Sequence, residues 1–356
     1  MARDGETYVL AGGGTGGHVF PAIAIAREIR RRRPDARVLF VGTRRGFEAV
    51  IAPKEGFPIE FIAASGFVGR GAGAKVRALS DLVRGIAQSR RILRRERAAA
   101  VLGVGGYASL PVLAAARMAG VPAMIQEQNS VPGIANRLGA RIARATAAGF
   151  EAACRRLPGR CVWTGNPVRE EFFRVPSAAA GGRRVLLFGG SQGARVLNRA
   201  IAGAAPALAA AGIEVLAQTG ERELGLVRDA VAPFPSITAV PFVDAMAEAF
   251  SRADLVVARA GALTLAEIAA AARPSILVPF AAATHAHQEE NARVFESAGA
   301  AVVIGEGDLD GATLARTVDE LLGDPGRLRR MGEAARTLGK PDAAERIVDL
   351  LFEIAE

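Results

Sequence analysis

A strand, a glycine-rich turn and a helix follow one another twice along this chain, first near its start and again after its midpoint. The first copy runs from "TYVLA" through "AGGGTGGHVF" into the helix-prone "AIAIAREI", and the second is "RRVLLFGGSQGARVLNRAI", beginning at Arg183. Glycine loses much conformational entropy on folding, so five glycines in the six positions 12–17 indicate bare backbone that must approach something closely. In α/β proteins the N–H groups and the dipole of such a helix start bind phosphate.

Short apolar runs alternate with alanine- and arginine-rich helical stretches along the whole chain. This alternation predicts parallel sheets covered by helices on both faces. A chain of 356 residues exceeds what one core usually holds, and Asn166-Pro167 interrupts regular structure before the pattern restarts. We therefore predict an α/β fold of two doubly wound parallel-sheet domains, 1–165 and 166–342, with the ligand in a cleft at the carboxyl ends of the strands.

The net charge and the two cysteines limit the kinds of ligand and the cellular compartment that we expect. The net charge of +9 and the pI of about 10.7 favour acidic partners, namely nucleic acid, an anionic membrane or a phosphorylated ligand. Two tyrosines, one tryptophan and no nucleic-acid motif argue against nucleic acid. Cys154 and Cys161 show neither a CxxC nor a metal-site spacing, so we expect no disulfide, no metal and a reducing cytoplasm.

Two more glycine loops follow predicted strands, at Gly103–Tyr107 and Gly189–Gly193. Each alone is compatible with a tight turn, whereas three loops at one cleft favour phosphate binding. Gly12-x-Gly14-x-x-Gly17 also fits the dinucleotide fingerprint. That fingerprint needs an acidic residue after the second strand, where Thr43-Arg44-Arg45 stands; NAD is therefore disfavoured and NADP stays open.

The segment "ARAGALTLAEIAAAA" places Gly261 just before a predicted helix. Thr264-x-x-Glu267 is typical of a capping box, in which both side chains satisfy backbone donors. The alternative is that Glu267 accepts hydrogen bonds from a ribose diol. Both interpretations are open at this point.

The motifs "GGTGGHVFPA", "GVGGYASLP", "QEQNSVPG", "GNPVR", "GGSQGARVLN", "RAGALTLAEI" and "HQEENA" occur in this order between Gly13 and Ala292. Together they closely resemble the MurG family of peptidoglycan N-acetylglucosaminyltransferases. The resemblance implies a GT-B fold of two Rossmann-like domains and a final helix, about 343–356, that packs back on the N-terminal domain. It also implies inverting transfer of GlcNAc from UDP-GlcNAc to the 4-hydroxyl of MurNAc in lipid I, forming lipid II, with no cofactor and no metal in the site.

The resemblance implies that domain 166–342 binds the donor, UDP-GlcNAc, and that domain 1–165 binds the acceptor and faces the membrane. Carried over position by position, most donor contacts fall in domain 166–342 and some in domain 1–165. These donor-binding residues are Thr15, Gly16, Gly17, Asn129, Arg169, Ser191, Val243, Ala262, Leu263, Thr264, Leu265, Ala266, Glu267 and Gln288. Gly13, Gly14, Gly105, Gly106 and Tyr107 belong to the acceptor and pyrophosphate loops. His18 is the first candidate for the general base, because imidazole titrates near neutrality, and Glu127 is the second.

Because lipid I lies in the bilayer, the resemblance also implies peripheral binding to the anionic cytoplasmic face of the cell membrane. Residues 70–97 place apolar residues at helical spacing among arginines, a pattern typical of a membrane-surface helix and also of an ordinary amphipathic helix. Another GT-B enzyme, such as a glycolipid synthase or a UDP-GlcNAc 2-epimerase, and a catalytically silent UDP-GlcNAc-binding regulator are the alternative functions.

Overall fold

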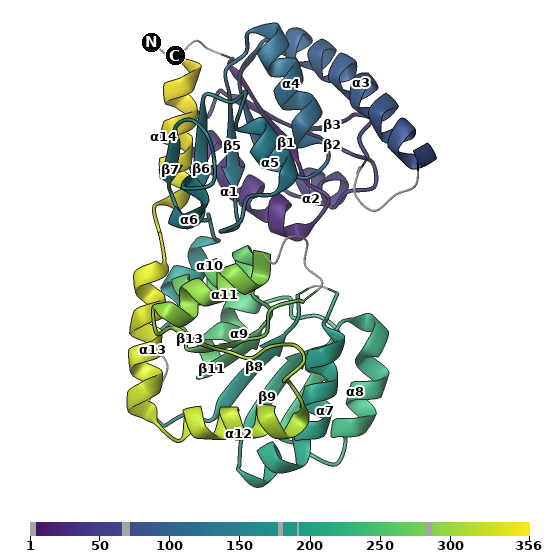
Figure 1. Ribbon diagram of the computed structural model, residues 1–356. Coiled ribbons are helices and arrows are strands. Elements are labelled where there is room, and N and C mark those ends of the chain that lie inside the picture. The colour runs from purple at the N-terminus through teal and green to yellow at the C-terminus, as the bar shows by residue number, and fades with distance from the viewer. Residues whose placement is uncertain (1–4, 66–71, 177–180, 191, 282–286) are drawn as a thin grey trace. The chain divides into compact units, whose positions relative to one another are not determined.

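The computed structural model describes residues 5–65, 72–176, 181–190, 192–281 and 287–356. The chain divides into two compact units: unit 1 is Met1–Val168 with Asp342–Glu356, and unit 2 is Arg169–Pro341. Each unit holds one parallel sheet with helices on both of its faces (Figure 1). The prediction of an α/β fold with two doubly wound parallel sheets is confirmed.

Unit 1 contains a seven-stranded sheet of order β3-β2-β1-β4-β5-β6-β7, in which every pairing is parallel. Its strands are β1 (Thr7–Gly12), β2 (Arg37–Gly42), β3 (Ile59–Phe61), β4 (Ala98–Gly105), β5 (Ala123–Glu127), β6 (Ala145–Ala148) and β7 (Cys161–Trp163). Its helices are α1 (Gly16–Arg32), α2 (Glu48–Lys54), α3 (Ala72–Arg95), α4 (Ser109–Ala119), α5 (Ile134–Gly139), α6 (Glu151–Cys154) and α14 (Ala343–Ala355).

Successive residues of β1 supply two different cores, because side chains in a strand alternate between the faces of a sheet. Tyr8 and Leu10 pack into a cluster that includes residues of α1 and α14. Val9 and Ala11 pack into the opposite cluster, which includes residues of α3 and α4. The near-continuous apolar strands therefore reflect burial on both faces, as is usual for a parallel sheet.

Helix α14 returns from the end of the chain to pack on unit 1, beside α1 and strands β4, β5 and β6 (Figure 1). Ile347 and Leu351 are fully buried there. The guanidinium of Arg33 lies 3.9 Å from the ring centroid of Phe352, and Arg144 donates a 2.8 Å hydrogen bond to the carbonyl of Ile354. Apolar burial and cation contacts thus both hold this helix on the sheet.

Shortening a buried side chain of α14 should destabilise unit 1 measurably. We expect Ile347→Val to lower the free energy of unfolding by about 0.5–1.5 kcal/mol, because a methylene leaves the core. Urea unfolding of unit 1, followed by circular dichroism, measures the change. The matched control is Ile134→Val, at a side chain that is 43% exposed; equal effects in the two variants would contradict the packing of α14.

The expectation that the two cysteines stay unpaired is wrong: Cys154 and Cys161 form a disulfide. Cys154 ends α6 and Cys161 begins β7, and these short elements pack against each other. Their Cα atoms lie 5.3 Å apart, within the range that a disulfide spans. Spacing in the sequence does not reveal this proximity, which depends on how the chain turns between α6 and β7.

Unit 2 contains a six-stranded parallel sheet of order β10-β9-β8-β11-β12-β13. Its strands are β8 (Arg184–Phe188), β9 (Glu214–Gln218), β10 (Ile237–Val240), β11 (Leu255–Ala258), β12 (Ser275–Leu277) and β13 (Ala301–Val303). Its helices are α7 (Arg195–Ala210), α8 (Leu224–Val231), α9 (Met246–Arg252), α10 (Ala262–Ala270), α11 (His287–Ser297), α12 (Gly311–Leu322) and α13 (Pro325–Leu338), with 3-10 turns η1 (Glu170–Arg174) and η2 (Glu221–Glu223).

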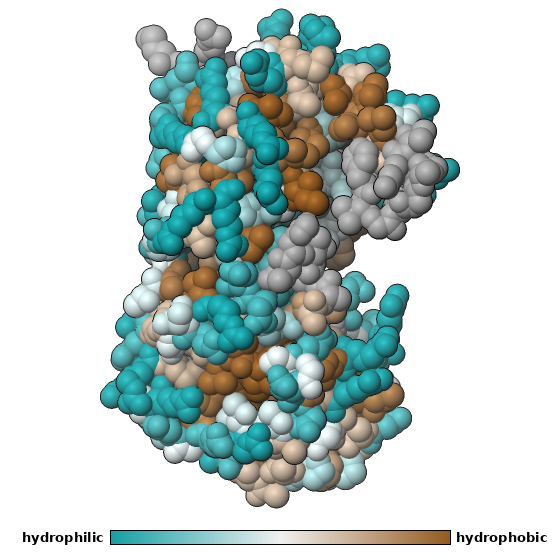
Figure 2. Space-filling view, viewed as in Figure 1, coloured by the Kyte–Doolittle hydropathy of each residue, from teal (hydrophilic) through white to brown (hydrophobic). Residues whose placement is uncertain are grey.

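Helix α3 directs two apolar side chains away from the core. Its buried face includes Ile92 and Leu93, whereas Leu79 is 57% exposed and Val83 is 61% exposed. Met118, at the end of the neighbouring helix α4, is 59% exposed. Figure 2 shows hydrophobic residues gathered at the surface over this part of unit 1. Within the described ranges, no helix is long and apolar enough to span a membrane.

Candidate active site

The first glycine loop of unit 1 is locked to the second by close backbone contact. The N–H of Gly13 donates a 3.2 Å hydrogen bond to the carbonyl of Gly105. A Cβ on Gly106 would lie 2.3 Å from the carbonyl oxygen of Gly13, and both glycines have positive φ. Glycine is therefore required at both positions, and the predicted loops come together at the carboxyl ends of β1 and β4.

His18 lies in the first turn of α1, over the second glycine loop. Its Nδ1 is 3.0 Å from the hydroxyl oxygen of Thr15, and a Cβ on Gly105 would lie 3.0 Å from its Nε2. Burial lowers the pKa of His18 from 6.5 to about 4, although the negative charge of Glu48 acts in the opposite direction. His18 is therefore neutral at pH 7, and one ring nitrogen can accept a proton.

Glu127, at the end of β5, is 1% exposed and serves as the centre of a network of amides. Its Oε1 accepts hydrogen bonds from the N–H and the side-chain amide of Asn129, at 2.8 and 3.3 Å. Its Oε2 accepts from the N–H of Gly133 at 3.0 Å and from Nδ2 of Asn136 at 2.9 Å. Burial raises the pKa of Glu127, and these four donors oppose that shift. The carboxylate thereby holds the loop between β5 and α5.

The remaining predicted residues of unit 1 lie at the start of α1 and after β4. Thr15 precedes α1, and Gly16 and Gly17 are its first two residues. The N–H of Gly14 is engaged internally by Glu48, at 2.7 Å. Tyr107, after β4, is 62% exposed.

In the glycine loop of unit 2, too, the backbone lies so close to a neighbouring segment that a side chain would not fit. Gly193 has a φ of +72°, and a Cβ there would lie 1.8 Å from the carbonyl oxygen of Thr219. Ser191 falls outside the described residues. Gln218, 1% exposed, donates from Nε2 to the carbonyl of Gly190 at 3.0 Å and accepts from the N–H of Val243 at 2.9 Å. Its side chain thus ties this loop to the segment after β10.

The capping-box interpretation of Thr264 and Glu267 is wrong. Helix α10 begins at Ala262 with Gly261 as its N-cap residue, and no side chain caps it. Thr264 therefore lies inside the helix rather than at the cap. The predicted residues Ala262, Leu263, Thr264, Leu265, Ala266 and Glu267 make up the first turn and a half of α10.

Glu267 is a poorly solvated carboxyl group beside one arginine. Its side chain is 13% exposed, and its Oε1 lies 4.0 Å from a guanidinium nitrogen of Arg169. Arg169 is itself engaged by Glu171 at 2.9 Å. Burial raises the pKa of Glu267 to about 7, while the charge of Arg169 acts to lower it. The group therefore changes charge near neutral pH.

Gln288, in the first turn of α11, accepts a 3.0 Å hydrogen bond from the N–H of Phe280 through Oε1. The segment at Phe280 is held further by Glu306, which accepts from the N–H of Ala281 at 2.9 Å and pairs with the buried Arg259 at 2.7 Å. These contacts fix the chain just ahead of residues 282–286, which are not described.

Sequence reasoning missed three residues that hold these loops: Glu48, Gln218 and Arg259. Each is buried and polar and lies at or soon after the end of a strand or at the start of a helix. Burial is the signal that distinguishes them, and it is not visible in a single sequence.

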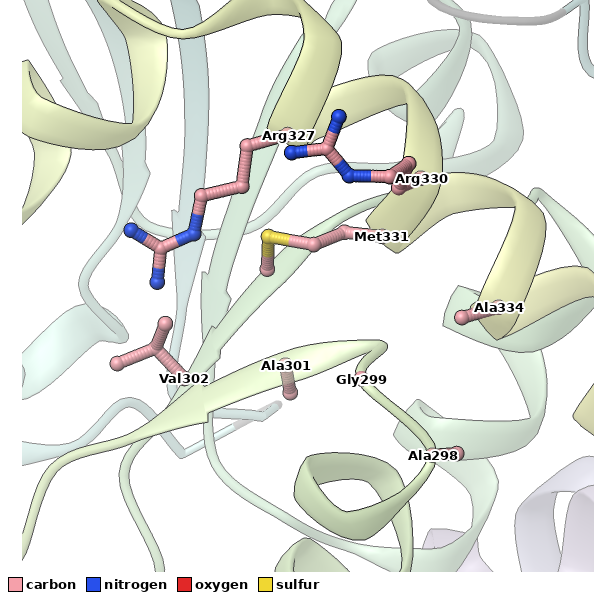
Figure 3. A pocket seen from close by; sticks show the side chains of 8 residues that line it. All are labelled: Ala298, Gly299, Ala301, Val302, Arg327, Arg330, Met331 and Ala334. Carbon is pink, nitrogen blue, oxygen red and sulfur yellow. The ribbon is translucent and has the colours of Figure 1, made fainter.

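A pocket of about 360 Å³ lies between β13 and α13 (Figure 3). Arg327, Arg330 and Met331 line one side of it and Val302 the other. None of the predicted site residues that the structure describes lines this pocket. Across the part of the chain that the structure describes, no group of three or more His, Cys, Asp or Glu residues could hold a metal ion.

Comparison with known proteins covers nearly the whole chain. The Glycosyltransferase family 28 N-terminal domain matches residues 8–148, and the Glycosyltransferase family 28 C-terminal domain matches residues 184–347. The UDP-N-acetylglucosamine--N-acetylmuramyl-(pentapeptide) pyrophosphoryl-undecaprenol N-acetylglucosamine transferase of Anaeromyxobacter dehalogenans (strain 2CP-1 / ATCC BAA-258) is 46% identical over 355 residues, covering 97% of this chain and 92% of the relative. The protein of the same name from Geobacter sulfurreducens is 42% identical over 354 residues, covering 96% of each.

Among solved structures, MurG of Acinetobacter baumannii matches with a TM-score of 0.79 and 29% identity, over 98% of this chain and 99% of that one. A UDP-GlcNAc 2-epimerase from Neisseria meningitidis matches with a TM-score of 0.67 at 10% identity, which shows a shared fold only. The fold is therefore GT-B, as predicted. From its two domain matches, its full-length relatives and this structural match, the chain belongs to the MurG family within glycosyltransferase family 28.

Proposed function

We propose that this chain transfers GlcNAc from UDP-GlcNAc to the 4-hydroxyl of MurNAc in undecaprenyl-pyrophosphoryl-MurNAc-pentapeptide (lipid I), giving lipid II and UDP with inversion at the anomeric carbon. The observation that carries the proposal is the similarity over 96–97% of the chain to relatives whose names state a transfer of N-acetylglucosamine between UDP-N-acetylglucosamine and N-acetylmuramyl-(pentapeptide) pyrophosphoryl-undecaprenol. Both glycosyltransferase domains of the family are represented.

Unit 2 supplies groups suited to the uridine diphosphate of the donor. The carboxylate of Glu267 accepts hydrogen bonds from the ribose diol, and Arg169 and Ser191 bind the diphosphate. The N–H of Val243 already donates to Gln218, so the carbonyl of Val243 is the group that we assign to the uracil. The side-chain amide of Gln288 binds hydroxyls of GlcNAc.

His18 takes the proton of the acceptor hydroxyl. When Nδ1–H donates to the hydroxyl oxygen of Thr15, Nε2 is left as the proton acceptor. The acceptor oxygen forms its bond to the anomeric carbon as the bond from that carbon to the diphosphate breaks, and the electron pair leaves with UDP. Each of the two carboxylate oxygens of Glu127 already accepts two hydrogen bonds. We therefore assign Glu127 to holding its loop and not to taking the acceptor proton.

The departing diphosphate gathers negative charge, which fixed donors stabilise in the transition state. Helix starts and Arg169 supply positive potential there. One helix dipole is worth about 0.3–1 kcal/mol at an exposed site. Several donors must therefore act together.

Transfer of radiolabelled GlcNAc from UDP-GlcNAc to a soluble lipid I analogue, in EDTA, tests the function. We expect a β-1,4 disaccharide, identified by NMR, and one UDP for each disaccharide. Donor binding without transfer would contradict the proposal and indicate a regulator. Formation of N-acetylmannosamine and UDP without acceptor would indicate an epimerase.

The exposed residues of α3 and α4 support peripheral binding to the cytoplasmic face of the cell membrane, where lipid I presents its sugar. Leu79, Val83 and Met118 expose apolar surface, and Arg77 and Arg84 are exposed on α3 beside it. Cations near an anionic leaflet contribute about 1 kcal/mol each. Apolar insertion and charge attraction together hold the enzyme at its lipid substrate.

Removing the apolar side chains should weaken membrane binding. We expect the double variant Leu79→Ser and Val83→Ser to lose most of its sedimentation with vesicles of phosphatidylglycerol and phosphatidylethanolamine, because two exposed apolar groups no longer enter the lipid. Leu226→Ser, at a residue of unit 2 that is 63% exposed, is the matched control. Unchanged sedimentation of the double variant would contradict this membrane surface.

A further inference from the structure

Glu48 is a buried carboxylate that no step of the proposed reaction uses. It is the first residue of α2, in unit 1, and it is 1% exposed. A buried carboxylate is costly unless hydrogen bonds satisfy it. The hydrogen-bond partners of this carboxylate therefore indicate its role.

Both oxygens of Glu48 accept hydrogen bonds from loops that follow neighbouring strands. Oε2 accepts from the N–H of Gly14 at 2.7 Å, in the first glycine loop after β1. Oε1 accepts from the N–H and the hydroxyl of Thr43, at 2.8 and 3.2 Å, in the loop after β2. Hydrogen bonds to a charged group are shorter and stronger than neutral ones. One side chain thus fastens the first glycine loop to the adjacent loop.

Three glycines leave the space that this carboxylate occupies. A Cβ on Gly13, Gly42 or Gly46 would lie 2.3, 2.3 or 2.0 Å, respectively, from the nearest atom of the Glu48 side chain. Gly42 and Gly46 have ordinary backbone angles, so the need for glycine at these two positions comes from the space and not from the conformation. The chain around Glu48 is therefore shaped to fit it.

The fastened loop carries Gly13 and His18, which are assigned to the acceptor, and Thr15, which is assigned to the donor. Gly13, next to the residue that Glu48 holds, bonds to the carbonyl of Gly105, and His18 packs over Gly105. Thr15, one residue after Gly14, contacts Nδ1 of His18. The carboxylate of Glu48 also acts on His18 through its charge, which raises the pKa of that imidazole against the effect of burial.

We propose that Glu48 is a positioning residue of the transfer reaction: its carboxylate fixes the first glycine loop so that Thr15 keeps its contact with His18 and His18 keeps its orientation toward the acceptor hydroxyl. Glu48 itself touches no substrate. The inference rests on the proposed function, in which His18 takes the acceptor proton. It adds a residue outside the glycine motif, 30 positions after His18 in the chain, to the machinery of that step.

Glu48→Gln tests the positioning role. A glutamine has one acceptor oxygen, so either Gly14 or Thr43 loses its partner and the loop loosens. We expect kcat to fall by about 10- to 100-fold at 20 °C, as for small misplacements of reacting groups, with a smaller rise in the KM for UDP-GlcNAc, because Thr15 of the same loop is assigned to the donor. A merely structural role would lower the melting temperature and leave kcat of the folded enzyme unchanged, which would overturn the proposal. Glu28→Gln is the matched control, because Glu28 is also buried in unit 1 but pairs with Arg31 on α1.

A second variant displaces the carboxylate without removing it. In Gly46→Ala the new Cβ would meet both oxygens of Glu48, at 2.0 and 2.2 Å, so the side chain must move away from the loop. We expect the same fall in kcat as for Glu48→Gln. Gly225→Ala, where a Cβ would meet nothing within 4 Å, controls for a glycine substitution as such.

Hydrogen exchange separates this inference from the proposed function. In the protein without ligands, we expect the peptide spanning residues 11–19 to exchange faster in Glu48→Gln and Gly46→Ala than in the wild type and the two controls. If the wild type is active and both variants show its exchange rate and its kcat, the positioning role of Glu48 would be overturned while the proposed function would stand. A wild type that makes no disaccharide, with faster exchange in both variants, would overturn the proposed function and the catalytic meaning of the loop, but not its attachment to Glu48.

Discussion

His18→Asn lowers kcat by about 10²- to 10⁴-fold, the range that a positioned general base contributes. Asparagine keeps a polar group near the hydroxyl of Thr15 but offers no basic nitrogen at the position of Nε2. The KM for UDP-GlcNAc should change little, because the loss concerns proton transfer to the enzyme and not donor binding. Single-turnover transfer to a lipid I analogue measures the chemical step directly.

The pH profile of the wild type provides a second test of His18. Burial lowers the pKa of His18 to about 4, and a base is active when deprotonated. The kcat measured at saturating UDP-GlcNAc should therefore stay level from pH 7 down to about 5 and fall only as pH approaches 4, rather than near the ordinary value of 6.5. A kcat of His18→Asn within twofold of the wild type would contradict this assignment and favour Glu127.

Glu267→Gln raises the KM for UDP-GlcNAc by about 10- to 100-fold, because hydrogen bonds to a charged acceptor are worth about 1.5–3 kcal/mol. The ribose diol presents two donors, and the neutral amide has one weaker acceptor oxygen. We expect kcat at saturating donor to change less than KM. Isothermal titration with UDP measures the same loss without the acceptor. Glu289→Gln is the control, on an α11 side chain that is 44% exposed and pairs with Arg293.

The stability of the wild type should depend on pH in a defined direction. Burial raises the pKa of Glu267 to about 7, so the folded protein binds this proton more tightly than the unfolded chain does. The associated stability is therefore complete below the ordinary carboxyl pKa and is lost as pH rises through about 7. Donor affinity should rise over the same interval, since the ionised form accepts both hydroxyls.

Glu267→Gln removes this proton linkage. Unit 2 of the variant should therefore melt higher than the wild type at pH 8.5 and closer to it at pH 5.5. UDP should bind more weakly to the variant at pH 8.5, where Glu267 of the wild type is ionised, and the difference in affinity should shrink at pH 5.5, where it is largely protonated. Thermal unfolding at the two values, with and without UDP, measures the difference. A variant that melts lower at pH 8.5 and binds UDP normally would show that Glu267 supports the helix instead of the ribose.

Much of the fold follows from local pattern. The apolar runs of β1, β4 and β8 and the glycines after them specify strand, turn and helix, because buried parallel strands are continuously apolar and close backbone approach needs glycine. The start of α10 after Gly261 is predicted correctly, whereas the capping role is not: Thr264-x-x-Glu267 matches a cap, yet Gly261 occupies the cap position. A local motif cannot show which of several neighbouring residues caps the helix when tertiary packing decides.

The sequence by itself determined the strand–loop–helix order, the two parallel sheets and, through its ordered motifs, the family. Tertiary structure alone decided that Cys154 pairs with Cys161, that Gln218 occupies the N–H of Val243, and that Glu48 holds Gly14. The physical reason is that periodicity and glycine act within a few residues, whereas burial and hydrogen-bond partners arise between residues far apart in the chain. Glu48 and Gly14 are separated by 34 positions, and only the folded sheet brings that carboxylate under that loop.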